Sequence, residues 1–175
     1  MRYRSLPSAE YLNACFSYDP ETGSLTWRHR ADKLPQLNAR QVGKEAGRLH
    51  PVKGHRQVEL DGVNYQVHRI IVKMVTGEEP PEQVDHEDGD GSNNCWCNLR
   101  VATHGQNRAN AKQVTPLPRG VTRNWKRFGA QIVHENKLRW LGTFDTPEEA
   151  HAAYRKAAEE LHGKFAYHVS RSEDD

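Results

Sequence analysis

The stretch VDHEDGDGSNNCWCNLRVATHGQN, residues 84–107, decides what this 175-residue chain can be. It holds an Asp-His pair, several asparagines, a Cys-Trp-Cys sequence and a second histidine. Glu87-Asp88-Gly89 allows a strand that carries the Asp-His pair to bend. Thr103 and Gln106 have the spacing of a capping box, so a helix is expected to begin at Thr103.

A structural zinc site is the first interpretation to test. Such sites usually pair cysteines separated by two to four residues. Cys95 and Cys97 are separated by one residue, and the third cysteine of the chain is Cys15. Cys15, His86 or His104 could complete a site only by accident of tertiary structure. The spacing therefore argues against structural zinc, and the two cysteines are expected to be loop residues.

A calcium loop of the EF-hand type is the second interpretation. That loop has Gly at its sixth position and Glu at its twelfth. Counted from Asp85, these positions are Asp90 and Trp96, and counted from Asp88 the twelfth is Leu99. Neither register fits, so an EF-hand is excluded.

Phosphodiester hydrolysis is the third interpretation. It needs a general base for water and a hard cation beside the phosphate. Asp85 offers a carboxylate to a metal ion, and His86 offers an imidazole that can act as a general base. Asn98 and Asn107 can supply amide oxygens, and Asn107 lies one turn into the expected helix. Adjacent strand residues point to opposite faces, so Asp85 and His86 share a site only if the strand bends there.

Together these residues resemble the HNH endonucleases. VDH at 84–86, NL at 98–99 and QN at 106–107 look most like the phage homing-endonuclease branch, whose third motif residue is Asn. YQVHRIIVKMV and YDPETGSLTW also look like segments of that branch, so the resemblance covers roughly residues 10–112. It implies a ββα-metal hairpin and helix at about 82–112. It also implies that Asp85 and Asn107 bind the metal, that His86 is the general base, and that Asn98 orients its imidazole.

The third motif residue bears on the choice of metal. Many family members place His there, whereas Asn107 gives an oxygen. Two oxygen ligands together with water and phosphate oxygens suit octahedral Mg²⁺ at about 2.1 Å. We therefore expect one Mg²⁺, with Mn²⁺ as a substitute and zinc only as an inhibitor.

The other histidines carry less information. His68 and Arg69 lie at an expected strand–helix junction, where they could contact a phosphate or simply cap the turn, and both alternatives stay open. His104 could support the site or contact a phosphate. The rest have no informative spacing and are expected at the surface: His29, His50, His55, His134, His151, His162 and His168.

The segment Arg119–Ala166 resembles the plant ethylene-response-factor DNA-binding domain through RGV, W..F.A.I, WLGTF.T.EEA and AY..AA. That resemblance implies a three-stranded antiparallel sheet on one helix, with the sheet in the major groove of double-stranded DNA. Thr122 and Val133 stand where the family often has Arg, so base preference should differ. Core packing is the alternative for Trp140 and the favoured interpretation for Phe144. The candidate DNA contacts are Arg119, Arg123, Trp125, Arg127, Gln131, Arg139 and Trp140.

Charge is segregated along the chain although the net charge is only +2. Residues 78–90 carry seven carboxylates and no Lys or Arg, whereas residues 100–140 carry nine Lys or Arg and one acid, Glu135. This pattern indicates a cation site next to a polyanion site, although loops can also collect charge by chance. The acids around Asp85 are expected to repel one another without metal.

The composition is that of a polar protein, with 35% hydrophobic residues and a mean hydropathy of -0.92. No apolar run approaches the roughly 20 residues that cross a bilayer, and the N-terminus lacks a signal-peptide core. Three cysteines do not make a disulfide framework. We expect a cytoplasmic monomer, located in the host-cell cytoplasm if phage-encoded, without a membrane partner.

The periodicity and turn residues predict an α+β protein of two domains. Residues 1–112 are the expected nuclease domain, 113–118 a linker, 119–168 the DNA-binding domain and 169–175 a disordered acidic tail. Helices are expected at 6–17, 69–77 and 146–162, and a loop at 29–45. Strands are expected at 24–28, 46–50, 55–60 and 63–68, with Asp61-Gly62 as a hairpin turn, and in two further segments between 119 and 144.

Two functions of different class fit these observations. The first is a sequence-targeted, Mg²⁺-dependent DNA endonuclease of the homing type; a single site cuts one strand, and nicking and double-strand cleavage both stay open as outcomes. The second is a DNA-binding transcriptional regulator with a non-catalytic HNH hairpin. All four motif residues are present, which favours the enzyme.

Overall fold

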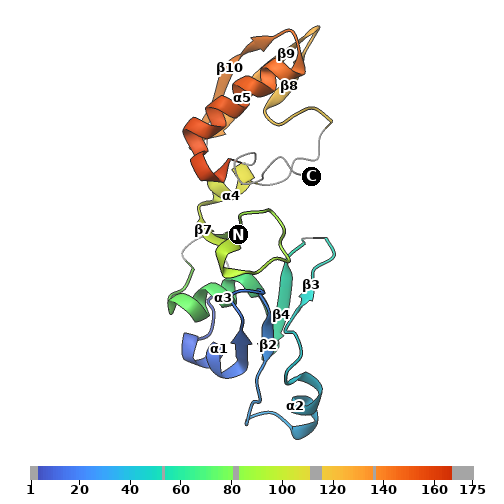
Figure 1. Ribbon diagram of the computed structural model, residues 1–175, viewed down its shortest axis with the longest axis vertical. Helices are drawn as coiled ribbons and strands as arrows, with labels where there is room; N and C mark the ends of the chain where they lie inside the picture. Colours follow the sequence, from blue (N-terminus) through green and yellow to red (C-terminus); the bar gives the residue numbers. More distant parts are fainter. Residues whose placement is uncertain (1–3, 53, 81–82, 111–115, 136, 167–175) are drawn as a thin grey trace. The chain divides into compact units, whose positions relative to one another are not determined.

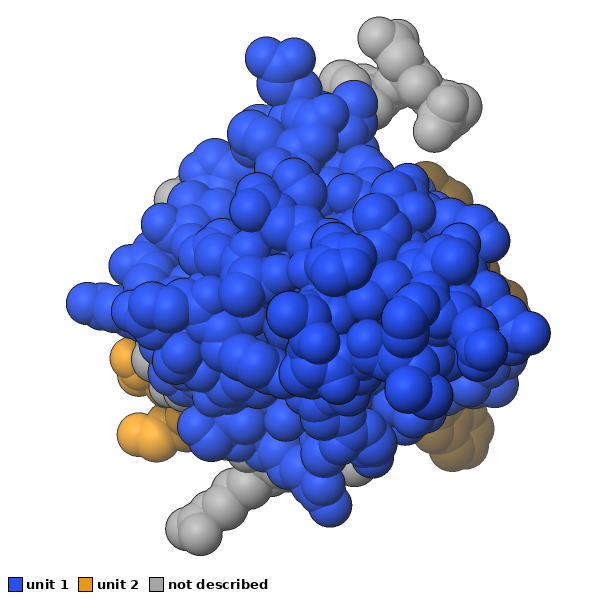
Figure 2. Space-filling model, turned by 90° about the horizontal axis from the view of Figure 1, so that it is seen from below, with its two compact units in different colours: residues 1–101 blue, residues 102–175 orange. Residues whose placement is uncertain are grey.

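The computed structural model describes residues 4–52, 54–80, 83–110, 116–135 and 137–166. The chain divides into two compact units, residues 1–101 and 102–175, which Figure 2 distinguishes by colour. The boundary between the two units precedes the predicted linker at 113–118. Residues 113–115 of that linker and the predicted acidic tail at 169–175 lie outside the described residues. Small antiparallel sheets combine with helices, so the expected α+β class is confirmed.

The first unit surrounds one apolar core. Its elements in chain order are α1 (Ala9–Cys15), β1 (Phe16–Tyr18), β2 (Leu25–Trp27), α2 (Pro35–Gln41), β3 (Arg48–Leu49), β4 (Arg56–Leu60), β5 (Val63–Gln66), α3 (Val67–Thr76), β6 (Gln83–His86), η1 (Trp96–Asn98) and β7 (Leu99–Ala102) (Figure 1). The strands pair as β1-β2, β3-β4-β5 and β6-β7. Helices α1 and α3 supply much of the core, including Leu12, Cys15, Val67, Ile70 and Ile71.

Three predictions for this unit need correction. The first helix ends at Cys15, because Phe16 already belongs to β1. The expected loop at 29–45 contains α2, which Pro35 opens at its first turn. The last predicted strand ends at Gln66, and α3 begins at Val67, so His68 is helical. As predicted, Gly77 ends α3, with the left-handed φ of 78° that glycine tolerates best.

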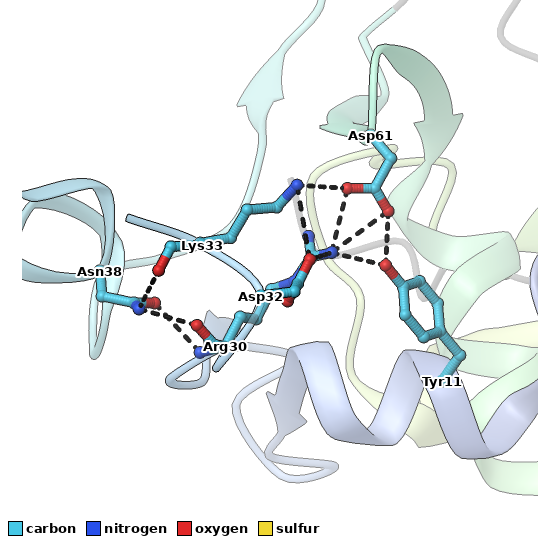
Figure 3. Close-up of polar contacts among 6 residues, drawn as sticks. All are labelled: Tyr11, Arg30, Asp32, Lys33, Asn38 and Asp61. Carbon is cyan, nitrogen blue, oxygen red and sulfur yellow. Dashed lines mark hydrogen bonds and ion pairs between the residues drawn. The ribbon is translucent and has the colours of Figure 1, made fainter. Parts of the chain in front are cut away.

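A polar network joins α1, the segment before α2 and the β4–β5 turn (Figure 3). The Arg30 guanidinium binds the carboxylates of Asp32 and Asp61, with N···O distances of 2.9 and 3.0 Å. Lys33 Nζ lies 2.8 Å from Asp61 Oδ1, and the Tyr11 hydroxyl donates to Asp61 Oδ2 at 2.6 Å. The network therefore anchors the long segment between β2 and β3.

This network predicts a dependence of stability on pH. Hydrogen bonds from Lys33 and Tyr11 hold the pKa of Asp61 at about 2, below its ordinary value of 3.8. A lowered folded-state pKa stabilises the protein above pH 3.8, and this stabilisation is lost as the pH falls toward 2. We expect Asp61→Asn to flatten the decrease in urea midpoint between these pH values. An unchanged acid profile in the variant would contradict this role.

The second unit contains α4 (His104–Asn110), the sheet β8 (Val121–Asn124), β9 (Arg127–His134) and β10 (Lys137–Phe144), and α5 (Pro147–His162) followed by η2 (Gly163–Phe165). The strand order is β10-β9-β8, and α5 lies along this sheet (Figure 1). The predicted capping box of α5 is present, with Thr146 and Glu149 as its members. Ala150 and Tyr154 are buried as expected, and Phe144 packs into the same core.

Gly120, before β8, has a specific packing role. Its φ is +75°, and a Cβ atom at this position would lie 2.0 Å from Tyr154 Cδ2 on α5. We expect Gly120→Ala to destabilise the second unit by about 1–3 kcal/mol, because it combines overpacking with a strained backbone. Thermal unfolding would measure this. Gly163→Ala is the matched control, since its φ is +51° but nothing lies within 4 Å of its Cβ position; equal losses would contradict the packing role.

Among the described residues, no helix combines the length and apolar character needed to cross a membrane.

Candidate active site

Asp85, His86 and Asn98 of the opening motif lie on a short hairpin in the first unit. Asp85 and His86 are the last two residues of β6, and both are buried. After them, the Glu87 amide donates to the Asn98 carbonyl at 2.9 Å, and the Gly89 amide donates to the His86 carbonyl at 2.9 Å. Gly89 has a φ of +70°, so the chain turns sharply directly after the Asp-His pair. The chain therefore turns at Glu87-Asp88-Gly89, and a shared site for Asp85 and His86 stays a prediction.

Arg100 on β7 is the ionic partner of Asp85. Both Nε and NH2 of Arg100 lie 2.9 Å from Asp85 Oδ2. The two side chains are only 10% and 6% exposed, and Arg100 NH1 lies 3.7 Å from Glu87 Oε1. The expected repulsion around Asp85 is therefore offset by Arg100, a counter-ion that the sequence interpretation did not identify.

The His86 imidazole is held by Asn94. His86 Nε2 lies 3.1 Å from Asn94 Oδ1, and Asn94 Nδ2 donates to the Ser92 carbonyl at 3.3 Å. The second contact orients the amide so that its oxygen faces the ring. Asn94 is fully buried and was not among the predicted site residues, although it lies in the quoted stretch.

Asn98 organises the turn between the two strands. Its Oδ1 accepts from the Asp88 amide at 2.9 Å, and its Nδ2 donates to Asp88 Oδ1 at 2.9 Å and to the Asn93 carbonyl at 2.8 Å. These contacts hold the loop from which Asn94 reaches His86. Asn98 thus supports the loop, and the imidazole contact seen in the structure comes from Asn94.

Three histidines cluster at this site. The rings of His55 and His86 stack with centroids 5.5 Å apart, and His68 lies edge-on to both at 5.2 and 5.1 Å. One ligand atom from each ring lies within 4.8 Å of the others. The prediction that His55 is a surface residue is therefore wrong, because tertiary contacts bring the start of β4 to the Asp-His pair. Burial, followed by the neighbouring His86 and His55, lowers the pKa of His68 well below its ordinary value of 6.5.

Arg69 is buried next to His68 in α3. Its NH2 donates to the Pro80 carbonyl at 3.0 Å and lies 3.6 Å from Glu79 Oε1. Arg69 is only 4% exposed, so its position does not favour a contact with a DNA phosphate. Its contacts instead tie α3 to the segment that leads into β6.

Asn107 lies on α4, in the second compact unit. The predicted helix start is confirmed: the Thr103 amide donates to Gln106 Oε1 at 2.8 Å, and the Gln106 amide donates to Thr103 Oγ1 at 3.2 Å. Thr103 alone separates α4 from β7. Asn107 is half-buried, and His104 is exposed at the first position of the helix.

The predicted DNA-binding residues of the three-stranded sheet lie on two different faces. Trp140 pairs with Gln131, and its ring lies over Gly129, where a Cβ would be 2.1 Å from Trp140 Cη2. The alternation along β9 places Arg127 on this face and the buried Ala130 and Ile132 on the face toward α5. We call the face with Arg127, Gln131 and Trp140 the outer face.

The remaining candidates lie elsewhere. Arg123 pairs with Phe128, and Arg139 pairs with Ile132, so their register places both on the helix side of the sheet. Trp125 is 93% exposed in the β8–β9 turn, with a φ of +55°. Arg119 NH1 donates to the Arg108 and Ala109 carbonyls within the second unit.

Comparison with known proteins agrees with this geometry. Residues 65–109 match the family model described as HNH endonuclease. The chain is 33% identical over 112 residues to an uncharacterized HNH endonuclease of Acanthamoeba polyphaga mimivirus, which covers 62% of this chain and 59% of that protein. The chain thus matches less than two thirds of that relative's length. The family match contains α3, the Asp85-His86 pair, the loop with Asn94 and Asn98, and Asn107, so residues 65–109 are similar to the domain of the HNH endonucleases, which supports a nuclease.

Proposed function

We propose that this protein is a Mg²⁺-dependent, sequence-targeted DNA endonuclease of the homing type that nicks its substrate. The observation that carries the proposal is the buried Asp85-His86 pair, with its carboxylate on Arg100 and its imidazole on Asn94, inside the segment that matches the HNH endonucleases. The domain assignment supports a nuclease. Magnesium, sequence targeting and the homing type rest on the proposal.

His86 is the general base in this proposal. The Asn94 oxygen accepts the proton on Nε2, so the lone pair of the neutral ring lies on Nδ1. That nitrogen takes a proton from the attacking water as the water oxygen bonds to phosphorus and the 3′ oxygen leaves. The products carry a 5′-phosphate and a 3′-hydroxyl.

The donor set fits a hard divalent cation. Asp85 offers a carboxylate oxygen, and Asn107 an amide oxygen. When bound, Mg²⁺ would offset charge that develops on the phosphate and the leaving oxygen. Arg100 holds the Asp85 carboxylate in place through an ion pair. The role of Asn107 as a ligand rests on its place in the HNH-like motif and is part of the proposal.

The outer face of the second unit is the proposed DNA-binding surface. Arg127 and Gln131 supply hydrogen-bond donors, and Trp140 supplies a rigid flat surface that is 54% exposed. Trp125 extends beyond the end of this face. An arginine-containing surface on a small sheet suits the major groove of double-stranded DNA.

Trp140 should contribute more to DNA affinity than its neighbour Arg139. We expect Trp140→Ala to weaken DNA binding by about 10-fold or more, because a large exposed ring on the outer face is lost. Arg139→Ala should change affinity by less than about 3-fold, since its register places it on the helix side. Fluorescence anisotropy with labelled duplex DNA measures both. A larger loss for Arg139→Ala would place the DNA on the other face.

The nuclease function is tested with supercoiled DNA and the full chain. Cleavage is expected with Mg²⁺ or Mn²⁺ and not with excess EDTA, and the first product should be the nicked circle. End-labelling should find 5′-phosphates. Absence of cleavage on every substrate, with salt-sensitive DNA binding retained, would contradict the proposal and favour the DNA-binding regulator.

A further inference from the structure

We propose that His55, His68 and His86 form a binding site for Zn²⁺ or a similar borderline transition metal, separate from the oxygen ligands proposed for Mg²⁺, and that its occupation inhibits the nuclease. The inhibitory part rests on the proposed function, because it assumes that His86 is the general base. The binding part does not.

The arrangement of donors suits zinc. The three ligand atoms lie within 4.8 Å of one another. Nitrogen ligands about 2.0–2.1 Å from a tetrahedral zinc ion are about 3.4 Å apart. Closing the cluster therefore requires shifts on the order of 1 Å, which small rotations of imidazole rings provide. Two further features, the second hydrogen bonds of the rings and the neighbouring carboxylates, favour a site over mere packing.

In two of the three rings, the Nε2 atom is hydrogen-bonded to an oxygen. In metal-binding histidines, the ring nitrogen that does not bind the metal usually makes such a bond. His86 Nε2 lies 3.1 Å from Asn94 Oδ1, and His68 Nε2 lies 3.1 Å from Gln66 Oε1. An amide oxygen that accepts from one ring nitrogen leaves a lone pair on the other and fixes the ring orientation. His68 Nδ1 is buried and makes no hydrogen bond to any described residue. A buried polar atom of this kind usually has a partner, and a metal ion would supply it.

The cluster also lies near negative charge. His68 and His86 are buried, and His55, directly before β4, is partly buried. The loop after His86 contributes Glu87, Asp88 and Asp90, which attract a dication. Gly91 presses against His55, since a Cβ there would lie 2.2 Å from His55 Nδ1, so this loop and His55 hold each other in place.

Zinc in this site would stop hydrolysis by taking the lone pair of His86. A nitrogen bonded to zinc accepts no proton from water. Mg²⁺ prefers oxygen ligands and would not compete for three imidazoles. The protein should therefore bind Zn²⁺ in the presence of excess Mg²⁺, and zinc should act as an inhibitor that magnesium does not displace.

Calorimetric titration of the full chain with Zn²⁺ in excess Mg²⁺ tests the binding. We expect one tight site per chain and a loss of affinity of at least about 10²-fold in His55→Phe, which keeps a stacked ring without a ligand nitrogen. His50→Phe, in the same loop, should bind zinc normally. Binding that is lost in Cys97→Ser rather than in His55→Phe, or absent from wild type, would overturn the site.

Nitrogen NMR of histidine-labelled wild-type protein gives a result that does not depend on a variant's folding. Zinc should shift ring nitrogens of His55, His68 and His86 together, and shifts confined to other histidines would overturn the site. In cleavage assays with Mg²⁺, zinc should inhibit wild type, and the fold-inhibition by zinc should be lost in His55→Phe when each protein is compared with its own zinc-free rate. If cleavage never occurs but zinc still binds the cluster, the proposed function fails and the metal site stands. If zinc fills the cluster of an active nuclease without slowing it, the inhibitory part is overturned.

Discussion

His86→Ala is expected to reduce the rate of DNA cleavage by at least about 100-fold. General-base catalysis typically contributes between 10² and 10⁴ in rate. His86 supplies the proposed base, and its neighbour Asn94 holds the ring by a contact of 3.1 Å. Affinity for duplex DNA should change little, because the outer face lies on β9 and β10 of the second unit. Rates of nicking and binding curves, measured on the same preparation, separate these effects.

Two controls make the His86 result specific. His50→Ala removes a histidine of the same unit that lies outside the proposed catalytic groups, and it should cleave at close to the wild-type rate. His86→Gln keeps a buried polar side chain that can still bond to Asn94 but cannot act as the base, so it should be as inactive as His86→Ala. Near-normal cleavage by His86→Gln would contradict the assignment of His86 as the base.

Asp85→Ala is expected to destabilise the first unit by about 3–5 kcal/mol, in addition to removing a proposed metal ligand. The reason is that Arg100, with a side chain only 10% exposed, loses the carboxylate that offsets its charge. Removing one member of a buried ion pair is costly in this way, whereas removing both is much less so. The double variant Asp85→Ala/Arg100→Met should therefore recover much of the lost stability. Urea unfolding, monitored through hydrogen exchange of the α3 backbone amides, measures the stability of the first unit specifically.

An exposed ion pair provides the matched control. Arg127 Nε lies 2.8 Å from Asp145 Oδ1, but these side chains are 52% and 79% exposed. Exposed pairs of this kind contribute at most about 1 kcal/mol, so Asp145→Ala should have a small effect. If Asp85→Ala were no more destabilising than Asp145→Ala, Arg100 would have to be solvated or paired elsewhere, and the ionic role inferred for it would be wrong.

The elements that could be predicted were those with strong local patterns. Thr146, Pro147 and Glu149 marked the start of α5, and the alanines with Tyr154 gave its buried side. The Asp61-Gly62 turn between β4 and β5 was equally clear, since both residues adopt positive φ. The α2 helix was missed because its residues have no strong apolar period, and only Asn38 is buried. Phe16 was assigned to a helix because an apolar residue at this position fits both the helical and the strand pattern. Only its pairing with Trp27 shows that it belongs to a strand.

The sequence by itself determined that Asp85, His86, Asn98 and Asn107 stand at the spacing of one HNH-like motif, because the types and spacing of these residues are local properties of the chain, and their common site stays a prediction. Only the tertiary structure decided which groups surround them. His55 lies 31 positions before His86 in the sequence, yet their rings stack with centroids 5.5 Å apart. Arg100 became the counter-ion of Asp85 through the pairing of β6 with β7, and Asn94 reached His86 through a loop that Asn98 holds. Such contacts depend on how the chain folds in three dimensions, and the local spacing of residues in the sequence does not reveal them.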